Sequence, residues 1–510
     1  MKRIVSFGLA IIVLSAAAAD AATCESLASL AQPNTTVTLA ESVPQGGFTQ
    51  PAGRGGANAY AALPAFCRVA VTLKPTPRSD IKAEVWMPST GWNGKLQVVG
   101  NGSFAGTIGY AAMATALASG YAAASTDTGH AGPAANTFVN EDVLNDYAYR
   151  SIHETTVAAK RIVDGFYGGA PKFTYFSGCS TGGRQALHEA QRYPDDFNGI
   201  VAGAPGLLAS RQAFAQNWMY QATVDPEAAL PREALTLVHD AVLNACDALD
   251  GAKDGVLENP LACRFDPQVL ACPSTSLGAS PSTSRGESTA NSCLTAPQVQ
   301  AVRKIYAGPS NPRTGEPIFP GLERGSELGW SAGPVGLAAD YFRFIVFKDP
   351  SWDPKALNFD SHVALVASRP EFQPLDATKT DLTPFTSRGG KLLMYQGWAE
   401  NGIPPRNVAT YYENVKTKTA GANDGVRLFM VPGMGHCGGG DGATTFDMIA
   451  ALDQWVTTGK APASIPASRV RNGKVDRTRP LCAYPQFAVY KGSGSVDEGA
   501  NFECRATAAQ

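Results

Sequence analysis

Two cysteines in this chain stand directly beside a serine and a histidine that lie far apart in the sequence. Cys179 precedes Ser180 within Gly-Cys-Ser-Thr-Gly, and Cys437 follows His436 within Gly-His-Cys-Gly. A disulfide requires its two Cα atoms to approach within about 4.4 to 6.8 Å. If these cysteines are joined, the fold must therefore bring the serine hydroxyl within hydrogen-bonding reach of the imidazole.

Segment 178–182 has the Gly-x-Ser-x-Gly pattern of a nucleophile elbow. In such an elbow, glycines permit a sharp turn between a strand and a helix, which raises the serine above the sheet. The flanking sequence agrees, because 172–177 has a strand pattern and 182–193 has helical spacing. We therefore predict that Ser180 is a nucleophile, the alternative being an incidental serine in a tight turn.

A serine nucleophile needs a base, and α/β-hydrolases supply an acid and then a histidine later in the chain. Of the histidines after Ser180, only His436 lies in a glycine-rich loop just after a predicted strand. The acid is expected after the preceding strand, where Glu400 stands, with Asp381 and Asp424 as substitutes. A solvated loop glutamate is the alternative interpretation of Glu400.

The oxyanion of a tetrahedral intermediate requires backbone N–H donors. One donor is expected from Thr181, directly after the nucleophile, and the other from a loop after an early strand. Loop 100–106 is the best candidate, with the N–H of Ser103 or Gly102 as the donor. An ordinary flexible turn is the alternative interpretation of this loop.

Strand and helix patterns alternate along much of the chain, which predicts an α/β fold with a mostly parallel sheet. Strands are expected at 81–88, 95–100, 120–127, 172–177, 199–205, 391–397 and 426–431, and further helices at 147–166 and 407–416. Between 207 and 385 the pattern changes to helical segments and a stretch rich in Ser, Thr and Gly. We interpret this region as a lid inserted into the sheet.

The N-terminus has the order of a secretory signal: Lys2-Arg3, an apolar run over 4–14, and small residues up to the cleavage site. The run is too short to span a bilayer, so a secreted or periplasmic protein is expected. The predicted domains are a signal peptide at 1–21, an α/β-hydrolase core in two parts at 22–206 and 386–510, and a lid domain at 207–385.

The ten cysteines fit an exported protein, because oxidising compartments retain disulfides. Apart from Cys179 and Cys437 they fall into close neighbours: Cys24 with Cys67, Cys246 with Cys263, Cys272 with Cys293, and Cys482 with Cys504. Spacing alone leaves the connectivity open.

Composition narrows the classes of partner. With 44% hydrophobic and 17% charged residues, the chain is expected to form a globular protein with a substantial core. A formal net charge of −2 gives no basic face for nucleic acid. After the N-terminus, no run reaches the roughly 18 apolar residues of a membrane helix. We expect no nucleic-acid, membrane or obligate protein partner.

Three aspartates lie close together in the predicted lid, namely Asp247, Asp250 and Asp254, with glycines between them. Close carboxylates repel one another unless a cation neutralises them, and hard oxygen ligands suit Ca²⁺. The backbone carbonyls of Ala252 and Val256 would complete the shell, although the spacing is not that of an EF-hand. We predict a structural calcium site here, with a polar cluster of Asx turns as the alternative.

Together these residues resemble the tannase and feruloyl esterase family of α/β-hydrolases, which is also similar to the bacterial mono(2-hydroxyethyl) terephthalate hydrolase. The resemblance covers nearly the whole mature chain. Its marks are Gly-Cys-Ser-x-Gly-Gly at 178–183, Val-Ala-Gly-Ala-Pro-Gly at 201–206, Cys-Asp-x-x-Asp-Gly-x-x-Asp-Gly at 246–255, Pro-Gly-Met-x-His-Cys at 432–437 and Arg-Pro-Leu-Cys-x-Tyr-Pro at 479–485.

The resemblance implies a hydrolase core, an inserted lid with a calcium site, and a disulfide joining Cys179 to Cys437. Two positions depart from the pattern. The family usually has aspartate where Glu400 stands, so the acid role carries over with a longer side chain. Thr181 stands where the terephthalate enzyme has glutamate. The stretch 341–350 is similar to the lid sequence of tannase-type members.

The resulting hypothesis is a secreted serine esterase that cleaves feruloyl, galloyl or related aryl esters through an acyl-enzyme. Lid aromatics are expected either to cover the aryl group or to form the lid core: Trp330, Tyr341 and Phe344. One alternative is a hydrolase of the mono(2-hydroxyethyl) terephthalate type. Another, from a different class, is a non-catalytic secreted binding protein on a hydrolase shell.

Overall fold

A computed structural model describes residues 23–51, 59–132, 134–273, 293–331, 333 and 336–506. The predicted signal segment 1–21 lies outside the described residues, and so does almost all of the Ser-, Thr- and Gly-rich stretch of the insertion.

Within the described residues, the centre of the fold is a nine-stranded sheet in the order β1-β2-β3-β5-β4-β6-β7-β8-β9. The strands are β1 (Thr35–Val43), β2 (Phe66–Leu73), β3 (Ile81–Pro88), β4 (Lys95–Val99), β5 (Ala122–Thr126), β6 (Phe173–Cys179), β7 (Gly199–Gly203), β8 (Lys391–Gly397) and β9 (Val426–Val431). Strands from β5 to β9 along the sheet pair in parallel, whereas β1, β2 and β3 form an antiparallel edge. The predicted mostly parallel α/β sheet is confirmed.

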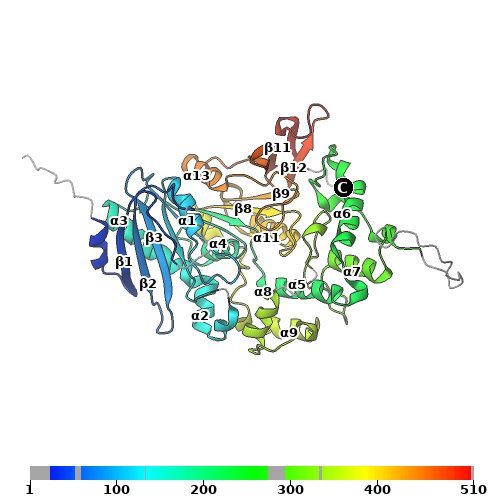
Figure 1. The fold of residues 1–510 in the computed structure, drawn as a ribbon, viewed down its shortest axis with the longest axis horizontal. Coiled ribbons are helices and arrows are strands. Elements are labelled where there is room, and N and C mark those ends of the chain that lie inside the picture. The colour runs from blue at the N-terminus through cyan, green and yellow to red at the C-terminus, as the bar shows by residue number, and fades with distance from the viewer. Residues whose placement is uncertain are drawn as a thin grey trace, which may run out of the picture.

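The central strands are short and apolar because helices cover both of their faces. Every residue of β5 and β7 is buried, as expected of parallel strands that contact helices on both sides. Ile162, Leu187 and Val408 pack on one face, and Met113 and Trp455 pack on the other. The covering helices, visible in Figure 1, are α3 (Ser151–Tyr167), α4 (Thr181–Arg192) and α11 (Pro405–Lys418) on the first face, and α1 (Tyr110–Ala118) and α13 (Met448–Thr458) on the second.

Strands β7 and β8 are neighbours in the sheet, although residues 204–390 separate them in the chain. This insertion has one apolar cluster of its own, around Val242 and Val302, and shares another, around Phe214 and Phe342, with the segment 104–148. It contains α5 (Ala209–Thr223), α6 (Arg232–Cys246), α7 (Ala296–Ala307), α8 (Gly336–Asp340), α9 (Ser361–Ala367) and α10 (Thr383–Thr386). Figure 1 shows α5, α6, α7, α8 and α9 grouped to one side of the sheet, whereas α10 directly precedes β8 and contacts α12 (Ala422–Gly425). The role of the insertion as a lid, and the domain boundaries, stay predictions.

Two antiparallel hairpins complete the C-terminal part: β10 (Ser464–Arg471) with β11 (Lys474–Cys482), and β12 (Gln486–Tyr490) with β13 (Phe502–Ala506). The sequence patterns did not predict them. The N–H of Tyr484 donates to the carbonyl of Leu428 over 2.8 Å, which ties this region to β9. The hairpins lie above β9 in Figure 1.

The remaining helices are short. They are α2 (Glu141–Asn145), α12 (Ala422–Gly425), the π-helical turns η3 (Asp146–Arg150) and η9 (Tyr341–Val346), and the 3₁₀ turns η1 (Cys24–Ser29), η2 (Ala135–Val139), η4 (Pro226–Ala228), η5 (Asp247–Asp250), η6 (Pro260–Ala262), η7 (Pro267–Leu270), η8 (Glu327–Gly329), η10 (Pro354–Ala356), η11 (Pro370–Phe372) and η12 (Gly499–Asn501). None of the helices in the described ranges has the length and hydropathy needed to cross a bilayer.

Four disulfides join cysteines that are close in the sequence, and all four predicted local pairs are confirmed. They link Cys24 to Cys67, Cys246 to Cys263, Cys272 to Cys293 and Cys482 to Cys504, with Cα–Cα distances of 5.4, 5.4, 4.9 and 5.6 Å. A fifth disulfide lies at the site described next.

Candidate active site

Ser180 stands alone between the end of β6 and the start of α4, and its φ of 65° and ψ of −119° lie outside the regions that non-glycine residues normally adopt. Neighbouring glycines permit this turn. A Cβ added to Gly178 would lie 2.6 Å from the backbone of Gly182, and one on Gly183 would lie 2.0 Å from the carbonyl oxygen of Gly203. Close backbone packing therefore fixes the serine in its strained conformation, as predicted for a nucleophile elbow.

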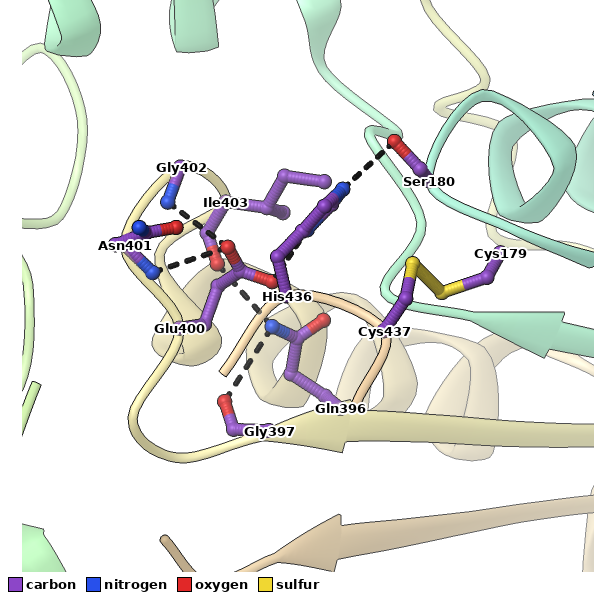
Figure 2. Close-up of a disulfide and its surroundings, with 10 residues drawn as sticks. All are labelled: Cys179, Ser180, Gln396, Gly397, Glu400, Asn401, Gly402, Ile403, His436 and Cys437. Atoms are coloured by element: carbon purple, nitrogen blue, oxygen red, sulfur yellow. Dashed lines mark hydrogen bonds and ion pairs between the residues drawn. A yellow bond between two sulfur atoms is a disulfide. The ribbon is translucent and has the colours of Figure 1, made fainter. Parts of the chain in front are cut away.

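Ser180, His436 and Glu400 form one hydrogen-bonded chain (Figure 2). His436 Nε2 lies 2.9 Å from Ser180 Oγ, and His436 Nδ1 lies 2.8 Å from Glu400 Oε2. Glu400 follows β8 and His436 follows β9, so the order along the chain is serine, acid and histidine. The structure thus brings together the three side chains that the sequence singled out.

The carboxylate of Glu400 is held from both sides. Its Oε1 accepts the backbone N–H groups of Asn401 and Gly402 over 3.0 and 2.8 Å, while Oε2 faces His436. The side chain is fully buried, and Figure 2 shows it folded back toward its own loop. Glu400 thus stands at the acid position that the sequence predicted, with both carboxylate oxygens engaged.

The hydrogen bond to Glu400 also acts on the protonation of His436. It raises the pKa of His436 above the ordinary histidine value, and burial opposes part of this effect. The carboxylate therefore favours the imidazolium, which is the form that a general base adopts after it has taken a proton.

The Cys179–Cys437 disulfide links the residue before the serine to the residue after the histidine. Its Cα–Cα distance is 6.0 Å, and Figure 2 shows the bridge beside the Ser180–His436 contact. This pairing was implied by the family resemblance and is confirmed.

The substitute acids lie elsewhere. Asp381 is exposed and accepts the N–H of Thr383 at the start of α10, and Asp424 is exposed within α12. Two other histidines also have separate surroundings: His188 is fully buried within α4, and His239 pairs with Glu327 in the insertion. None of these residues contacts His436 within the described part of the chain.

The two predicted oxyanion residues are neighbours in space. Thr181 is the first residue of α4, and its Oγ1 donates to the carbonyl oxygen of Ser103 over 2.6 Å. The N–H of Gly182 donates to the carbonyl of Asn101 over 2.8 Å, so the loop after β4 is attached to the nucleophile helix. Among the described residues, the backbone N–H groups of Thr181 and Ser103 have no hydrogen-bond acceptor, which leaves both as candidate donors to an oxyanion.

A cavity opens beside the serine. It is lined by Phe104, Tyr147, Ser180, Thr181, Arg184, Gly206, Ala209, Gln212, Ala213, Gln216, Leu337, Ala338, Tyr341, Leu375 and Ile403. The insertion supplies more than half of these residues, so it forms one wall of the cavity. The lining is mainly apolar and aromatic, as is common for sites that bind small organic molecules.

Of the three aromatics expected over the aryl group, only Tyr341 is among the residues lining this cavity. Trp330 packs edge-on against Tyr306 in one core cluster of the insertion, and Phe344 packs against the other. Trp330 and Phe344 thus pack in or against apolar clusters, as in the second interpretation, and coverage of an aryl group by any of the three aromatics stays a prediction.

The predicted calcium loop is partly occupied by protein partners. Asp247 accepts backbone N–H groups from 254, 255 and 256, and Asp254 pairs with Arg477 and Arg479. Asp250 Oδ2 is buried without a partner, and burial raises the pKa of Asp250 to about 6. No group of three or more metal-binding side chains was found within the described ranges. The carbonyls of Ala252 and Val256 belong to the same loop, and the calcium site stays a prediction.

The sheet order and the strand–turn–helix elbow define an α/β-hydrolase fold, and solved structures agree. Feruloyl esterase B from Aspergillus oryzae superimposes with a TM-score of 0.85 at 30% identity over 95% of this chain and 99% of the other. The tannin acyl hydrolase from Aspergillus niger has the same fold, with a TM-score of 0.75 at 22% identity over 93% of this chain and 92% of the other.

Sequence comparisons give the family. The model for tannase and feruloyl esterase matches residues 67–505. An uncharacterized esterase from Xanthomonas campestris is 40% identical over 96% of this chain and 92% of its own length, and a probable feruloyl esterase B-2 from Aspergillus terreus is 33% identical over 97% and 98%. The chain belongs to the tannase and feruloyl esterase family and is a carboxylic ester hydrolase of that type.

Proposed function

We propose that this protein is an exported serine esterase that hydrolyses esters of aromatic acids through an acyl-enzyme. The observation that supports it most is the continuous chain from Ser180 Oγ through His436 to Glu400, with contacts of 2.9 and 2.8 Å. This is the arrangement in which a histidine takes the proton of a serine hydroxyl while a carboxylate stabilises the imidazolium.

In the first half-reaction, Ser180 Oγ attacks the ester carbonyl as His436 Nε2 takes the hydroxyl proton. The carbonyl oxygen becomes an oxyanion, which the N–H groups of Thr181 and Ser103 stabilise. His436 then gives the proton to the departing alcohol oxygen as its bond to the acyl carbon breaks. In the second half, water attacks the acyl-enzyme, His436 takes its proton and returns it to Ser180, and the acid is released.

The preference for aromatic acids is supported by the cavity beside the serine. Phe104, Tyr147 and Tyr341 present aromatic surface there, and Leu375 and Ile403 add aliphatic surface. Aromatic faces and edges pack favourably with a planar ring. The relative from Aspergillus terreus is a probable feruloyl esterase, and ferulic acid is an aromatic acid.

The test is a Ser180→Ala variant assayed with methyl ferulate, methyl gallate and mono(2-hydroxyethyl) terephthalate, with the exposed-serine variant Ser368→Ala as the control. We expect kcat to fall by about 10⁴-fold or more only in Ser180→Ala, and a fluorophosphonate probe to label only proteins that keep Ser180. Full turnover by Ser180→Ala would refute the serine mechanism. Absence of both turnover and labelling in the unaltered protein would favour the non-catalytic alternative, and the best of the three substrates identifies the acyl preference.

We also propose that the loop 247–256 binds a structural Ca²⁺ ion. Its support is the unpartnered, buried Oδ2 of Asp250 within a loop rich in oxygen ligands. Ligand binding to the folded state at about 100 times Kd adds roughly 2.7 kcal/mol of stability. We therefore expect Ca²⁺ to raise Tm over that in a chelator, and Asp250→Asn to abolish the rise. An equal Tm with and without Ca²⁺ would contradict the site.

Export is likewise a proposal, supported by the five disulfides in the described residues. N-terminal sequencing of the protein recovered outside the cytoplasm should begin after the predicted signal segment 1–21. Recovery of the uncleaved chain in the cytoplasm, with free thiols, would contradict it.

A further inference from the structure

The carbonyl oxygen of Ser103 accepts hydrogen bonds from two side-chain hydroxyls. Thr181 Oγ1 lies 2.6 Å from it and Tyr147 Oη lies 2.8 Å from it. The two hydroxyls come from different elements, since Thr181 opens α4 and Tyr147 lies in the π-helical turn η3. Both lone pairs of one carbonyl are thus used by side chains that also line the cavity beside Ser180.

The backbone of this loop needs such restraint. Ser103 has a φ of 51° and Ala105 a φ of 58°, which are left-handed values that residues with a Cβ rarely adopt. The N–H of Ala105 donates to the carbonyl of Gly102 over 2.9 Å, so residues 102–105 form a tight turn. A conformation of this kind persists only when the surrounding contacts determine it.

Tyr147 is itself held firmly. Tyr147 is 3% exposed, and its ring stacks on Phe138 with the two centroids 4.6 Å apart. The guanidinium of Arg184, a residue of α4, lies 4.8 Å from the centroid of the Tyr147 ring. A ring fixed in this way has little freedom to move its hydroxyl, so the bond to the Ser103 carbonyl has a defined direction.

The base of the loop is attached to α4 independently of these hydroxyls. Asn101 accepts from and donates to the side-chain amide of Gln185, and its carbonyl accepts the N–H of Gly182. The Asn101 side chain also donates to the carbonyl of Thr126 over 2.8 Å. Removal of a hydroxyl at the tip therefore leaves the base of the loop in place.

We propose that the side chains of Thr181 and Tyr147 are positioning residues of the oxyanion site, which hold the Ser103 carbonyl and so keep Ser103 in the backbone conformation that directs its own N–H toward the reacting carbonyl. This inference rests on the proposed serine esterase function. Oxyanion stabilisation depends on donors that are fixed before the reaction begins. Thr181 would contribute twice, through its backbone N–H as a donor and through its hydroxyl as a restraint on the second donor.

The expected signature is a loss in kcat with little change in KM, because the donors act on charge that develops only in the transition state. Removal of a whole oxyanion donor lowers kcat by about 10²- to 10³-fold, and loss of one of two restraints should lower it less. We expect roughly a 10-fold fall in kcat for Thr181→Val and for Tyr147→Phe. The conservative variant Thr181→Ser, which keeps the hydroxyl, should remain within about twofold of the unaltered enzyme.

The experiment measures kcat and KM for methyl ferulate, the rate of fluorophosphonate inactivation, and inhibition by the product acid ferulate. The inactivation rate should fall in parallel with kcat, whereas ferulate inhibition should stay within about twofold. Tyr411→Phe is the matched control, since its buried hydroxyl donates to the carbonyl of Lys379 and the residue does not line the cavity. Its kcat should be unchanged.

Three results would overturn the inference: an unchanged kcat in both Thr181→Val and Tyr147→Phe, an equal loss in Thr181→Ser and Thr181→Val, or ferulate inhibition weakened as much as kcat. The last would mean that the hydroxyls shape the acyl pocket instead. Failure of the proposed function is distinguishable, because the unaltered enzyme would then lack turnover and labelling at Ser180. If one variant fails to fold, the other still decides.

Discussion

Removal of the disulfide between the serine and histidine motifs is the most informative perturbation of this protein. The double variant Cys179→Ala/Cys437→Ala deletes the disulfide that joins the elbow to the histidine loop, without leaving a free thiol. The histidine loop is rich in glycine, and the carbonyl of Gly439 accepts the N–H of Gly435 over 3.3 Å. The bridge adds a covalent restraint on the position of His436 to the backbone hydrogen bonds of this loop.

The stability effect follows from the length of chain that the bridge closes. Its cysteines are 258 positions apart, whereas those of the other four pairs are 43, 17, 21 and 22 apart. In the chain-entropy model, the long closure stabilises the folded state by about 5 to 6 kcal/mol and the shorter ones by about 3 to 4 kcal/mol each. These values are upper bounds for a chain that keeps its other crosslinks.

The catalytic effect is a separate quantity. A displacement of about 1 Å in a reacting group lowers the rate by roughly 100-fold, so we expect kcat to fall by about 10- to 100-fold as the 2.9 Å contact between His436 Nε2 and Ser180 Oγ loosens.

The assay combines denaturant unfolding with kcat for methyl ferulate. The matched control is Cys272→Ala/Cys293→Ala, which removes a bridge in the insertion and should lower stability without a comparable loss of kcat. A double variant at 179 and 437 that keeps both its kcat and its unfolding midpoint would refute the idea that the bridge restrains the catalytic contact.

Glu400→Gln should lower kcat by about 10³- to 10⁴-fold, because it loses the charge that stabilises the imidazolium. Glu400→Asp should lower kcat less, because it keeps the charge but is too short to keep all three contacts. Equal kcat values for these two variants would contradict this account. Glu400 raises the pKa of His436, and only the neutral imidazole is a base, so kcat/KM should fall as pH drops through this raised pKa. Glu400→Gln should move the acidic limb of the pH profile to lower pH. If the limb does not move, another group titrates there. Gly183→Ala should lower Tm, because the added Cβ would lie 2.0 Å from the carbonyl oxygen of Gly203. Gly169→Ala should leave Tm unchanged, because no atom lies within 4 Å of the Cβ that it adds. Similar Tm values for the two variants would contradict the close packing of the elbow.

Local patterns predicted which side chains meet at the candidate active site, because each of them lies in a short segment with a recognisable pattern. The elbow at 178–182 combines glycine spacing with strand and helix patterns, and the predicted β8 and β9 ranges coincide with Lys391–Gly397 and Val426–Val431. Buried parallel strands are continuous apolar runs, so their positions are readable without knowledge of their neighbours. β1 and the two C-terminal hairpins were missed, because partly exposed antiparallel strands have weaker patterns. β2 was also missed, although most of its residues are buried.

Apart from the bridge between Cys179 and Cys437, contacts between distant segments were beyond the reach of such patterns. Neither the ion pairs of Asp254 with Arg477 and Arg479 nor the placement of Tyr147 against the oxyanion loop has a local signal. The burial of Trp330 within the insertion was equally undecided, since an aromatic residue fits a core or a cavity wall.

The sequence by itself determined the α/β class, the strand–serine–helix turn and the order of serine, acid and histidine. These features depend on residue spacing within short segments and on the order of those segments along the chain. Only the tertiary structure decided which carboxylate oxygen of Glu400 faces His436, which aromatics line the cavity, and which hydroxyls donate to the Ser103 carbonyl. Those features depend on the directions of side chains brought together from distant parts of the chain, and such directions are set by packing rather than by periodicity.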